Sequence, residues 1–325
     1  MDFSCETFIN IKSILVTGGC GFIGSNFLNI CVKQFPNILF CNIDKMDYCS
    51  SQENLTIKQY KNYKFYECDI SNYEYVKYIL EFNNIDLVVN FAAHSFVDAS
   101  FDNPISFTTN NVLGTHIFLE TCRKYGKIQK FIHMSTDEVY GDNNEEILIF
   151  DEKSLLNPTN PYSASKGCCD LILNSYKYTY KFPVIIVRCN NVYGLNQYPE
   201  KVIPKFIKYL KNKRKITIHG NGYMLRSFIH VYDVINAIII IMNDGIVGEI
   251  YNIGSKNEYS ILQLAELLIQ IIYNNNLIYD YIEFIDDRLY NDKCYNIDYS
   301  KLVKMGWKEN FDFYTSLIEL VNVTF

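Results

Sequence analysis

The sequence predicts an α/β fold in which a doubly wound parallel sheet is joined to a smaller mixed α/β domain. Short apolar runs of strand length alternate with longer segments of helical period up to Arg188, as βαβ units require. A glycine-rich segment connects the first apolar run to the first helical segment, which is typical of this fold. The chain has 325 residues, of which 49% are hydrophobic, so it can bury a large core without disulfides or metal ions.

Six apolar runs are predicted strands, and four segments of helical period lie between them. Because parallel strands need long crossover connections, which are usually helices, this alternation predicts one sheet with helices on both faces. The strands are Ser13–Thr17, Ile38–Ile43, Lys64–Glu67, Leu87–Phe91, Phe131–Ser135 and Val184–Arg188. The helices are Gly24–Phe35, Tyr73–Phe82, Pro104–Tyr125 and Pro161–Lys181.

The regular alternation is lost after Arg188, and we place a soft domain boundary near Gly194. Residues 1–194 are predicted to form the first domain and residues 195–325 the second, with 231–253 returning to the first. No low-complexity linker separates them, so they are expected to pack around a shared cleft. The second part contains predicted helices at Pro199–Lys211, Val231–Asn243 and Ile261–Ile272 and predicted strands at Lys215–His219 and Glu249–Ile253.

The composition argues against several classes of protein. With 36 acidic and 30 basic residues the net charge is -6, so we expect no nucleic-acid partner. The 11 cysteines are scattered, and their only close pair is Cys168–Cys169, which favours reduced thiols in a cytoplasmic protein and no metal site. Met1–Lys12 lacks a signal-peptide pattern, and the apolar segment Val234–Met242 is far shorter than the roughly 20 residues that cross a bilayer, so we expect no membrane partner.

The segment ILVTGGCGFIG places Gly18, Gly21 and Gly24 at three-residue intervals between a strand and a helix. Glycines let the backbone turn tightly and approach a pyrophosphate, which then faces the N–H groups of the helix. Asp44 follows 20 residues later, at the end of the next strand, where a carboxylate can bind the adenosine ribose hydroxyls and repel a 2′-phosphate. These features predict a Rossmann-type site for NAD rather than NADP. A glycine turn that serves packing alone is the alternative.

Other residues at the strand ends are expected to line the same cofactor site. Asp69 follows the third strand, and its carboxylate can meet the adenine amino group, although a helix cap before Ser71 is an equally good interpretation. Small side chains after the fourth strand would let the cofactor backbone pass close by. Beyond the glycines and Asp44, the predicted cofactor residues are Phe22, Ile23, Lys45, Asp69, Ile70, Ala92, Ala93, Ser135, Tyr162 and Lys166.

The segment NPYSASK begins a predicted helix with Asn160 as its cap and Pro161 in its first turn. Tyr162 and Lys166 then share one face of this helix. A phenol has an ordinary pKa near 10, so it needs a nearby ammonium and the nicotinamide charge to act as a base at neutral pH. Tyr/Lys pairs at this spacing are common on helical surfaces, and it is the upstream glycine loop that favours the catalytic interpretation.

The segment STDEVYG follows the fifth strand, so its side chains are expected at the carboxyl end of the sheet. Adjacent carboxyls in a shielded site resist double ionisation, so one can stay protonated as an acid while its neighbour acts as a base. Asp137 and Glu138 therefore suit the elimination of water. A solvated acidic turn is the alternative.

The glycine loop, STDEVYG and the Tyr162/Lys166 pair together resemble the nucleotide-sugar 4,6-dehydratases of the extended short-chain dehydrogenase/reductase class, over nearly the whole chain. Asp44–Ser50, Arg188–Gly194 and Tyr198–Pro204 look especially like the UDP-glucose 4,6-dehydratase domain of plant-type rhamnose synthases, and less like bacterial dTDP-glucose enzymes. The resemblance implies NAD in the first domain, a nucleotide sugar in the second, a homodimer formed through Pro104–Tyr125 and Pro161–Lys181, and a step toward rhamnose-type deoxysugars.

The resemblance also implies catalytic roles. Tyr162 removes the sugar O4 proton while the C4 hydride passes to NAD, with Lys166 tuning the phenol and Thr136, or the serine before it, holding the hydroxyl. Glu138 takes the C5 proton, Asp137 protonates the departing C6 hydroxyl, and the hydride returns to C6. NAD is regenerated in each turnover, so it is expected to stay bound.

For the nucleotide and the diphosphate, the resemblance implies Asn191, Glu200, Lys201, Arg226 and Asn291. A guanidinium such as that of Arg226 can bridge diphosphate oxygens bidentately, and a surface arginine in a loop is its alternative. The sequence departs from the family pattern in four places: it has Leu289 where proline is usual, Cys294 where arginine is usual, His94 where glutamate or glutamine is common, and Ala99 in place of a larger side chain. We interpret the histidine as structural, near the cofactor.

Two other functions are weighed against the dehydratase. A nucleotide-sugar 4-epimerase would use the same Tyr162, Lys166 and NAD, but it would have no need of the acids at Asp137 and Glu138. A non-catalytic NAD-binding scaffold would be expected to have lost Tyr162 or Lys166, and both are present. The sequence leaves open whether the nucleotide is UDP or dTDP.

Overall fold

Seven parallel strands form the central sheet of the computed structural model, which describes residues 11–142, 149–275, 277–287, 290 and 296–323. The strand order is β10-β6-β5-β4-β1-β2-β3, so the order reverses beside β1. In open parallel sheets such a reversal opens a crevice at the carboxyl ends of the strands. The strands are β1 (Ser13–Thr17), β2 (Leu39–Asp44), β3 (Tyr63–Glu67), β4 (Leu87–Asn90), β5 (Lys130–Thr136), β6 (Val184–Cys189) and β10 (Ile250–Ile253).

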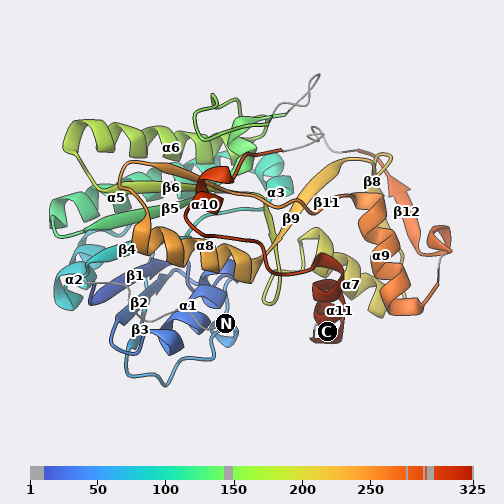
Figure 1. Ribbon diagram of the computed structural model, residues 1–325, viewed down its shortest axis with the longest axis horizontal. Coiled ribbons are helices and arrows are strands. Elements are labelled where there is room, and N and C mark those ends of the chain that lie inside the picture. The colour runs from blue at the N-terminus through green and yellow to red at the C-terminus, as the bar shows by residue number, and fades with distance from the viewer. Residues whose placement is uncertain (1–10, 143–148, 276, 288–289, 291–295, 324–325) are drawn as a thin grey trace.

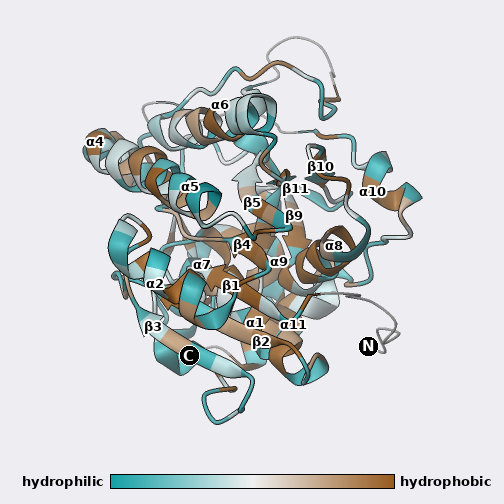
Figure 2. Cartoon of the chain, turned by 90° about the vertical axis from the view of Figure 1, so that its left-hand side faces the viewer, coloured by the Kyte–Doolittle hydropathy of each residue, from teal (hydrophilic) through white to brown (hydrophobic). Residues whose placement is uncertain are grey.

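Helices cover both faces of this sheet (Figure 1). Side chains alternate along β1: Ile14 and Val16 join one buried cluster and Leu15 the other. The apolar strands therefore lie between two helical layers (Figure 2), and the predicted doubly wound α/β fold is confirmed. One layer contains α1 (Phe22–Gln34) and α8 (Val231–Asp244), and the other contains α2 (Tyr73–Asn83), α5 (Gly114–Tyr125) and α6 (Pro161–Tyr180).

The smaller part of the molecule has its own buried cluster and lies at the right in Figure 1. It contains a three-stranded sheet in the order β11-β9-β7 and a two-stranded sheet in the order β12-β8. The strands are β7 (Asn191–Tyr193), β8 (Ile216–His219), β9 (Leu225–His230), β11 (Glu258–Ser260) and β12 (Ile282–Ile285). The helices are α7 (Val202–Lys211), α9 (Ile261–Tyr273) and α11 (Phe313–Val323), while the short α10 (Ser300–Lys304) lies against β10.

The chain from α8 to β10 leaves the smaller part and rejoins the large sheet. α8 packs on α1, and β10 pairs in parallel with β6, so that Tyr251 lies opposite Val187. This edge strand lies between two excursions of the chain into the smaller part, one from β7 to β9 before it and one from β11 to β12 after it. The two parts are therefore linked by several crossings of the chain rather than by one linker.

The predicted helix Pro104–Tyr125 is not one continuous α-helix. It consists of α4 (Pro104–Phe107), a π-helical segment η2 (Thr108–Leu113) and α5. The wider π turn holds Asn111, whose side chain accepts from the His94 N–H at 2.7 Å and donates to the His94 carbonyl at 2.9 Å. This pairing with a distant loop explains why helical periodicity alone did not indicate the interruption.

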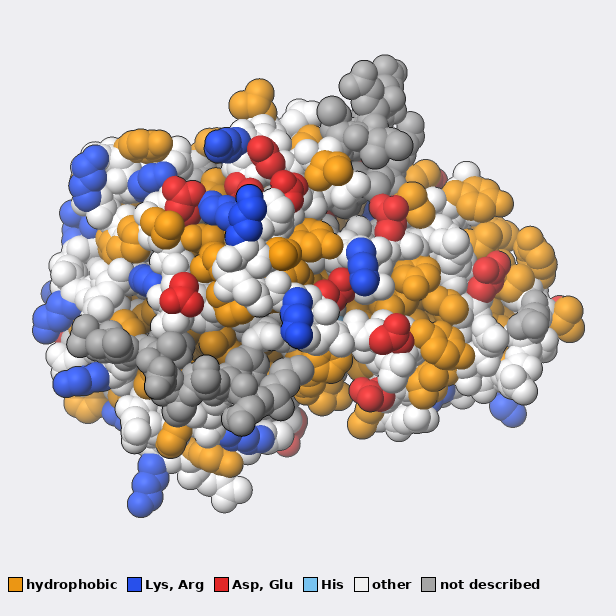
Figure 3. Space-filling model, viewed as in Figure 1, with side chains coloured by type: hydrophobic (Ala, Val, Ile, Leu, Met, Phe, Trp, Pro, Cys, Tyr) orange, Lys and Arg blue, Asp and Glu red, His pale blue; other side chains and the backbone are white. Residues whose placement is uncertain are grey.

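Several elements were not predicted. Most of them are too short for a periodicity to be recognised, but α11, with 11 residues, is as long as the predicted helix α2. The elements that were not predicted are α3 (Val97–Asp102), α10, α11, β7, β9, β11, β12 and the 3-10 turns η1 (Gln52–Asn54), η3 (Asp137–Tyr140) and η4 (Ile278–Asp280). Among the described residues no helix combines the length and the apolar character needed to span a membrane. On the face drawn in Figure 3, acidic and basic side chains are interspersed.

Candidate active site

A cleft opens at the carboxyl ends of the parallel strands, between the large sheet and the smaller part of the molecule. Every predicted site residue that the structure describes lines it. Asn291 lies outside the described residues, as do Leu289 and Cys294. The predicted residues in the cleft are Gly18, Gly21, Phe22, Ile23, Gly24, Asp44, Lys45, Asp69, Ile70, Ala92, Ala93, Ser135, Thr136, Asp137, Glu138, Tyr162, Lys166, Asn191, Glu200, Lys201 and Arg226.

The glycine loop connects β1 to the start of α1. Gly18 has a φ of +67°, and a Cβ there would lie 2.9 Å from the backbone of Ala92. A Cβ on Gly24 would lie 2.4 Å from the Gly18 carbonyl oxygen, whereas one on Gly21 would meet only that oxygen, at 3.3 Å. No side chain caps α1 and its first turn has no acid, so its N–H groups can face a phosphate. The loop therefore fits a pyrophosphate.

Asp44 ends β2 and is fixed by two backbone groups. One carboxylate oxygen accepts from the N–H of Cys20 at 2.9 Å, and the other accepts from the N–H of Met46 at 2.9 Å. A carboxylate can accept about four hydrogen bonds, so acceptor capacity remains for ribose hydroxyls. Asp69 accepts from both the N–H and the hydroxyl of Ser71, at 2.8 and 2.7 Å. It therefore closes the turn after β3 while it also lines the cleft.

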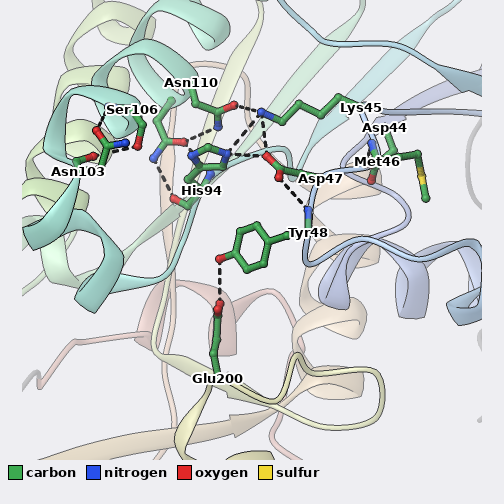
Figure 4. A network of polar contacts seen from close by, with 11 residues as sticks. Asp44, Lys45, Met46, Asp47, Tyr48, His94, Asn103, Ser106, Asn110 and Glu200 are labelled. Carbon is green, nitrogen blue, oxygen red and sulfur yellow. Dashed lines mark hydrogen bonds and ion pairs between the residues drawn. The ribbon is translucent and has the colours of Figure 1, made fainter.

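A polar cluster joins the loop after β2 to the loop after β4 (Figure 4). His94 Nε2 and Lys45 Nζ lie 2.9 and 3.1 Å from an oxygen of Asp47, and the lysine also donates to Asn110 Oδ1 at 2.6 Å. Burial opposes ionisation of Asp47, but hydrogen bonds from His94, the Tyr48 N–H and Lys45 lower its pKa to about 2. His94, which we interpret as a structural residue, therefore belongs to a polar cluster at the edge of the cleft, on the side where the cofactor is expected.

Asp137 is buried in the 3-10 turn η3 directly after β5, with 2% of its surface exposed. Thr136 Oγ1 donates to one of its oxygens at 3.2 Å, and Asn190 Nδ2 donates to the other at 2.5 Å. Burial raises the pKa of Asp137 to about 7, with a further contribution from the charge of Glu138, and the two hydrogen bonds do not offset it. This carboxyl can therefore hold a proton near neutral pH.

Glu138 is less buried than Asp137 and is held by a different partner. Its Oε2 accepts from Asn160 Nδ2 at 3.1 Å, and its backbone N–H donates to Thr136 Oγ1 at 3.3 Å. Asn160 caps α6, which carries Tyr162 in its first turn. The two acids, the tyrosine and the lysine thus meet where β5 and α6 converge on the cleft.

Tyr162 and Lys166 lie in a buried environment. Burial, together with the charge of Glu138, raises the pKa of Tyr162, and burial lowers the pKa of Lys166. The Lys166 ammonium donates to the Met134 carbonyl at 2.6 Å and lies 3.1 Å from His133 Nε2, so at least one of its three donors remains for a bound molecule. Deprotonation of the phenol therefore needs further positive charge.

Comparison with known protein families identifies the family of this chain. The family described as GDP-mannose 4,6 dehydratase matches residues 15–320, which is nearly the whole sequence. The chain belongs to this family. A dTDP-D-glucose 4,6-dehydratase from Dictyostelium discoideum is 44% identical over 341 residues, covering 92% of this chain and 78% of that protein. A trifunctional enzyme from Arabidopsis thaliana, which includes a UDP-glucose 4,6-dehydratase activity, is 42% identical over 300 residues, or 92% of this chain and 44% of that protein.

Among solved structures, the dTDP-glucose 4,6-dehydratase of Streptomyces venezuelae, crystallised with NAD, superimposes with a TM-score of 0.90. It is 32% identical, and the alignment covers 95% of this chain and 96% of that one. This member of the family therefore has the fold of an extended short-chain dehydrogenase/reductase over nearly its full described length.

The predicted substrate residues come from the smaller part and from the segment before α7. Arg226 lies on β9 and donates to the Leu225 carbonyl at 2.7 Å. Glu200 accepts from the Tyr48 hydroxyl at 3.2 Å, and Lys201 donates to the Ser95 carbonyl at 2.6 Å. The contacts of Glu200 and Lys201 connect the segment before α7 with the loops after β2 and β4.

Sequence reasoning missed the partners that hold the predicted side chains. Asn190 contacts Asp137 across 53 residues of sequence, and His133 contacts Lys166 across 33. His133 is in turn bonded to Asn90 at 2.9 Å. The signal that could have found them is strand adjacency: Asn90 ends β4, Asn190 directly follows β6, and β5, which carries His133, pairs with both of these strands.

Proposed function

We propose that this protein is an NAD-dependent nucleotide-sugar 4,6-dehydratase that converts dTDP-glucose or UDP-glucose into the 4-keto-6-deoxyglucose nucleotide. The observation that carries the proposal is the buried Asp137, whose pKa is raised to about 7, beside the less buried Glu138. Elimination of water needs an acid and a base that act at C6 and C5, whereas 4-epimerisation needs proton transfer only at O4, for which Tyr162 suffices. Family membership and the named dehydratases that this chain resembles support the same reaction.

Each reacting proton has a side chain assigned to it. Tyr162 takes the proton of the sugar O4 hydroxyl as the C4 alcohol becomes a ketone, and Thr136 holds this hydroxyl. The ketone makes the C5 proton acidic, and Glu138 removes it. The C5–H electron pair then forms the C5=C6 double bond, and the C6 hydroxyl leaves as water with a proton from Asp137. When bound, NAD would supply the redox chemistry, accepting hydride from C4 and returning it to C6. Glu138 returns a proton to C5 as C6 is reduced, and the proton that Tyr162 took from O4 balances the one that Asp137 gave to the departing water.

The fit of NAD rests on the chain's own groups. The glycine loop leaves the N-terminus of α1 open to a pyrophosphate, Asp44 offers acceptors to the adenosine ribose, and Lys166 keeps one free donor at the nicotinamide end. The positive nicotinamide charge would stabilise the Tyr162 phenolate, whose formation burial opposes. Asp44 beside the ribose would also repel the 2′-phosphate of NADP.

Separate incubations with dTDP-glucose and UDP-glucose test the proposal. The expected product has lost one water and carries a 4-ketone, with no added redox partner consumed. A product isomeric with its substrate would establish the epimerase instead, and absence of turnover with both sugars would favour the scaffold. The identities of 44% and 42% to relatives named for the two nucleotides are too similar to choose between them, so the ratio of kcat/KM decides.

The homodimer is proposed on the surface of the two helical segments that the sequence indicated. Ile105 is 71% exposed and Leu171 is 62% exposed, although both are apolar. Pairing across a two-fold axis would bury them. Static light scattering at micromolar concentration should give twice the chain mass, and Leu171→Asp should shift the mass toward the monomer. A wild-type protein that scatters only as a monomer would contradict the dimer.

The domain division and the location of the protein are also proposals. We assign NAD to residues 1–194 and the nucleotide sugar to 195–325, with 231–253 belonging to the first unit because β10 pairs with β6. We place the protein in the cytoplasm, where thiols stay reduced, because the described cysteines are free and most are buried. Cell fractionation tests the location.

A further inference from the structure

Asn160 uses both ends of its side-chain amide. Its Oδ1 accepts from the N–H of Ser163 at 2.9 Å and caps α6, while the Ser163 hydroxyl accepts from the Asn160 N–H at 3.2 Å to complete a capping box. The other end, Nδ2, donates to Glu138 Oε2 at 3.1 Å. The residue is 6% exposed. One buried side chain therefore joins the start of the catalytic helix to an acid of the site.

The cap fixes which way the amide faces. A backbone N–H can only donate, so the oxygen of Asn160 must face Ser163 and its NH₂ group must face Glu138. Glu138 Oε2 is consequently an acceptor, and a proton cannot sit on that oxygen along this hydrogen bond. The same constraint acts on one oxygen of Asp137, because Asn190 Oδ1 accepts from the Ser255 N–H at 3.0 Å and the Asn190 NH₂ group must then face Asp137 Oδ2. The other oxygen of Asp137 faces the Thr136 hydroxyl at 3.2 Å, which can accept as well as donate, so a proton can sit on that oxygen.

We propose that Asn160 is a positioning residue that holds Glu138 as a hydrogen-bond acceptor, aimed at the C5 proton of the sugar. The inference rests on the proposed dehydratase function and goes beyond it, because it assigns the choice of base to a helix cap. Hydrogen bonding to a carboxylate favours its charged form, and a second anchor removes a rotamer that Glu138 would otherwise sample. Tyr162 lies two residues after Asn160, so one cap sets the position of the bases for both half-reactions.

Two substitutions separate the cap from the donor. Asn160→Ser keeps a side chain that ranks with asparagine as an N-cap but removes the NH₂ group. Asn160→Asp also keeps a cap, and it places a carboxylate beside Glu138. We expect C5 proton exchange with deuterated solvent to slow by roughly 10- to 100-fold in the serine variant, part of the usual contribution of a general base, and by more in the aspartate variant. Oxidation at C4 should continue, so reduced nicotinamide should accumulate in its near-ultraviolet absorbance during turnover.

Asn103→Ser is the matched control. Asn103 also caps a helix, is also followed by proline, and accepts from the N–H of Ser106 at 3.4 Å (Figure 4), but its side chain is exposed. This variant should exchange the C5 proton at the wild-type rate. Equal C5 exchange in Asn160→Ser and wild type would overturn the proposal. An equal fall in C4 oxidation and C5 exchange, with a lower melting temperature, would show a purely structural cap and would also overturn it.

The same experiment distinguishes failure of this inference from failure of the proposed function. A wild-type protein that removes no water from either dTDP-glucose or UDP-glucose would overturn both. A wild-type protein that removes water, together with an Asn160→Ser variant that does so equally fast without accumulating reduced nicotinamide, would overturn only the role of Asn160.

Discussion

Asp137 and Glu138 are neighbours in the chain, but they lie in different surroundings. Asp137 is buried beneath the ends of β5 and β6 and bonded to Asn190, whereas Glu138 reaches toward the cleft and is bonded to Asn160. Burial disfavours the charged form of a carboxyl, so the more buried of the two keeps its proton more readily. The geometry therefore makes the aspartate the acid although its ordinary pKa of 3.8 is lower than the 4.5 of a glutamate.

Asp137→Asn should stabilise the fold at alkaline pH while it abolishes the acid. The folded-state pKa of about 7 lies above the ordinary value of 3.8, so between these pH values the folded state holds a proton that the unfolded state releases. Ionisation of Asp137 therefore costs stability progressively as the pH rises through this range. We expect a higher melting temperature for the variant at pH 8, a smaller difference near pH 5, and turnover lowered by roughly 10²- to 10⁴-fold. An unchanged or lower melting temperature at pH 8 would contradict the raised pKa.

The individual site residues could be predicted because their signals are local. Spacing along the helix indicated Tyr162 and Lys166, and adjacency in the sequence indicated Asp137 and Glu138. The partners Asn190 and His133 were not predicted. The contact of Asn190 with Asp137 depends on β5 and β6 becoming neighbours in the sheet, and the contact of His133 with Lys166 depends on how α6 packs on β5. Asn160 was predicted as a cap from its local sequence, but its bond to Glu138 depends on how α6 approaches β5.

The first turn of α1 lies close to the glycine loop that precedes it: the backbone at Gly24 approaches the carbonyl oxygen of Gly18. Gly24→Ala would place a Cβ 2.4 Å from the Gly18 carbonyl oxygen, so the loop must move. We expect a loss of about 1–3 kcal/mol in the free energy of unfolding, as overpacking typically costs, and less NAD per chain after purification. Gly114→Ala is the control: its Cβ would lie 3.6 Å from Ile70, and alanine favours the helix by about 1 kcal/mol. Equal NAD contents in the two variants would contradict the close-approach role.

A buried ion pair between Arg188 and Asp170 connects the strand β6 to the helix α6. Arg188 Nε on β6 donates to Asp170 Oδ2 on α6 at 2.9 Å, and the guanidinium lies 4.8 Å from the centre of the Tyr140 ring. Removing one partner leaves an uncompensated buried charge, so Arg188→Met should lower the free energy of unfolding by about 3–5 kcal/mol. Adding Asp170→Asn to Arg188→Met should restore part of the lost free energy of unfolding, because it removes the uncompensated charge. Urea denaturation measures both, and a loss below about 1 kcal/mol, as for an exposed pair, would contradict the burial of this contact.

Most long elements followed from periodicity, although the 11-residue helix α11 was missed. The strand Ser13–Thr17 has its predicted bounds, and α8 and α9 differ from prediction by one residue. The interruption of Pro104–Tyr125 escaped prediction, because the π turn depends on the contacts of Asn111 with His94 and with Ser165. Elements of three to six residues in the smaller part carry too few side chains to display a period.

At the scale of the whole molecule, the predicted catalytic and binding residues that the structure describes lie in the cleft at the carboxyl ends of the strands, where the strand order reverses. The glycine loop follows β1, the acids follow β5, and the substrate candidates lie on β7, on β9 and in the segment before α7, so residues far apart in the sequence meet at one cleft. The sequence predicted the parallel sheet and its carboxyl-end site through general rules of βαβ connection. The return of β10 to the edge of the large sheet makes the two parts one interlocked structure, which no linker motif marks.

Isotope transfer within one sugar tests the central claim most directly. The protein is incubated with glucose nucleotide that carries deuterium at C4, mixed with unlabelled sugar, and the product is analysed by mass spectrometry and NMR. Deuterium found at C6 of the molecule that began with it at C4, together with loss of one water, is the predicted result. Deuterium left at C4, or lost to solvent, would contradict the mechanism, since the acids at Asp137 and Glu138 would then have no elimination to catalyse.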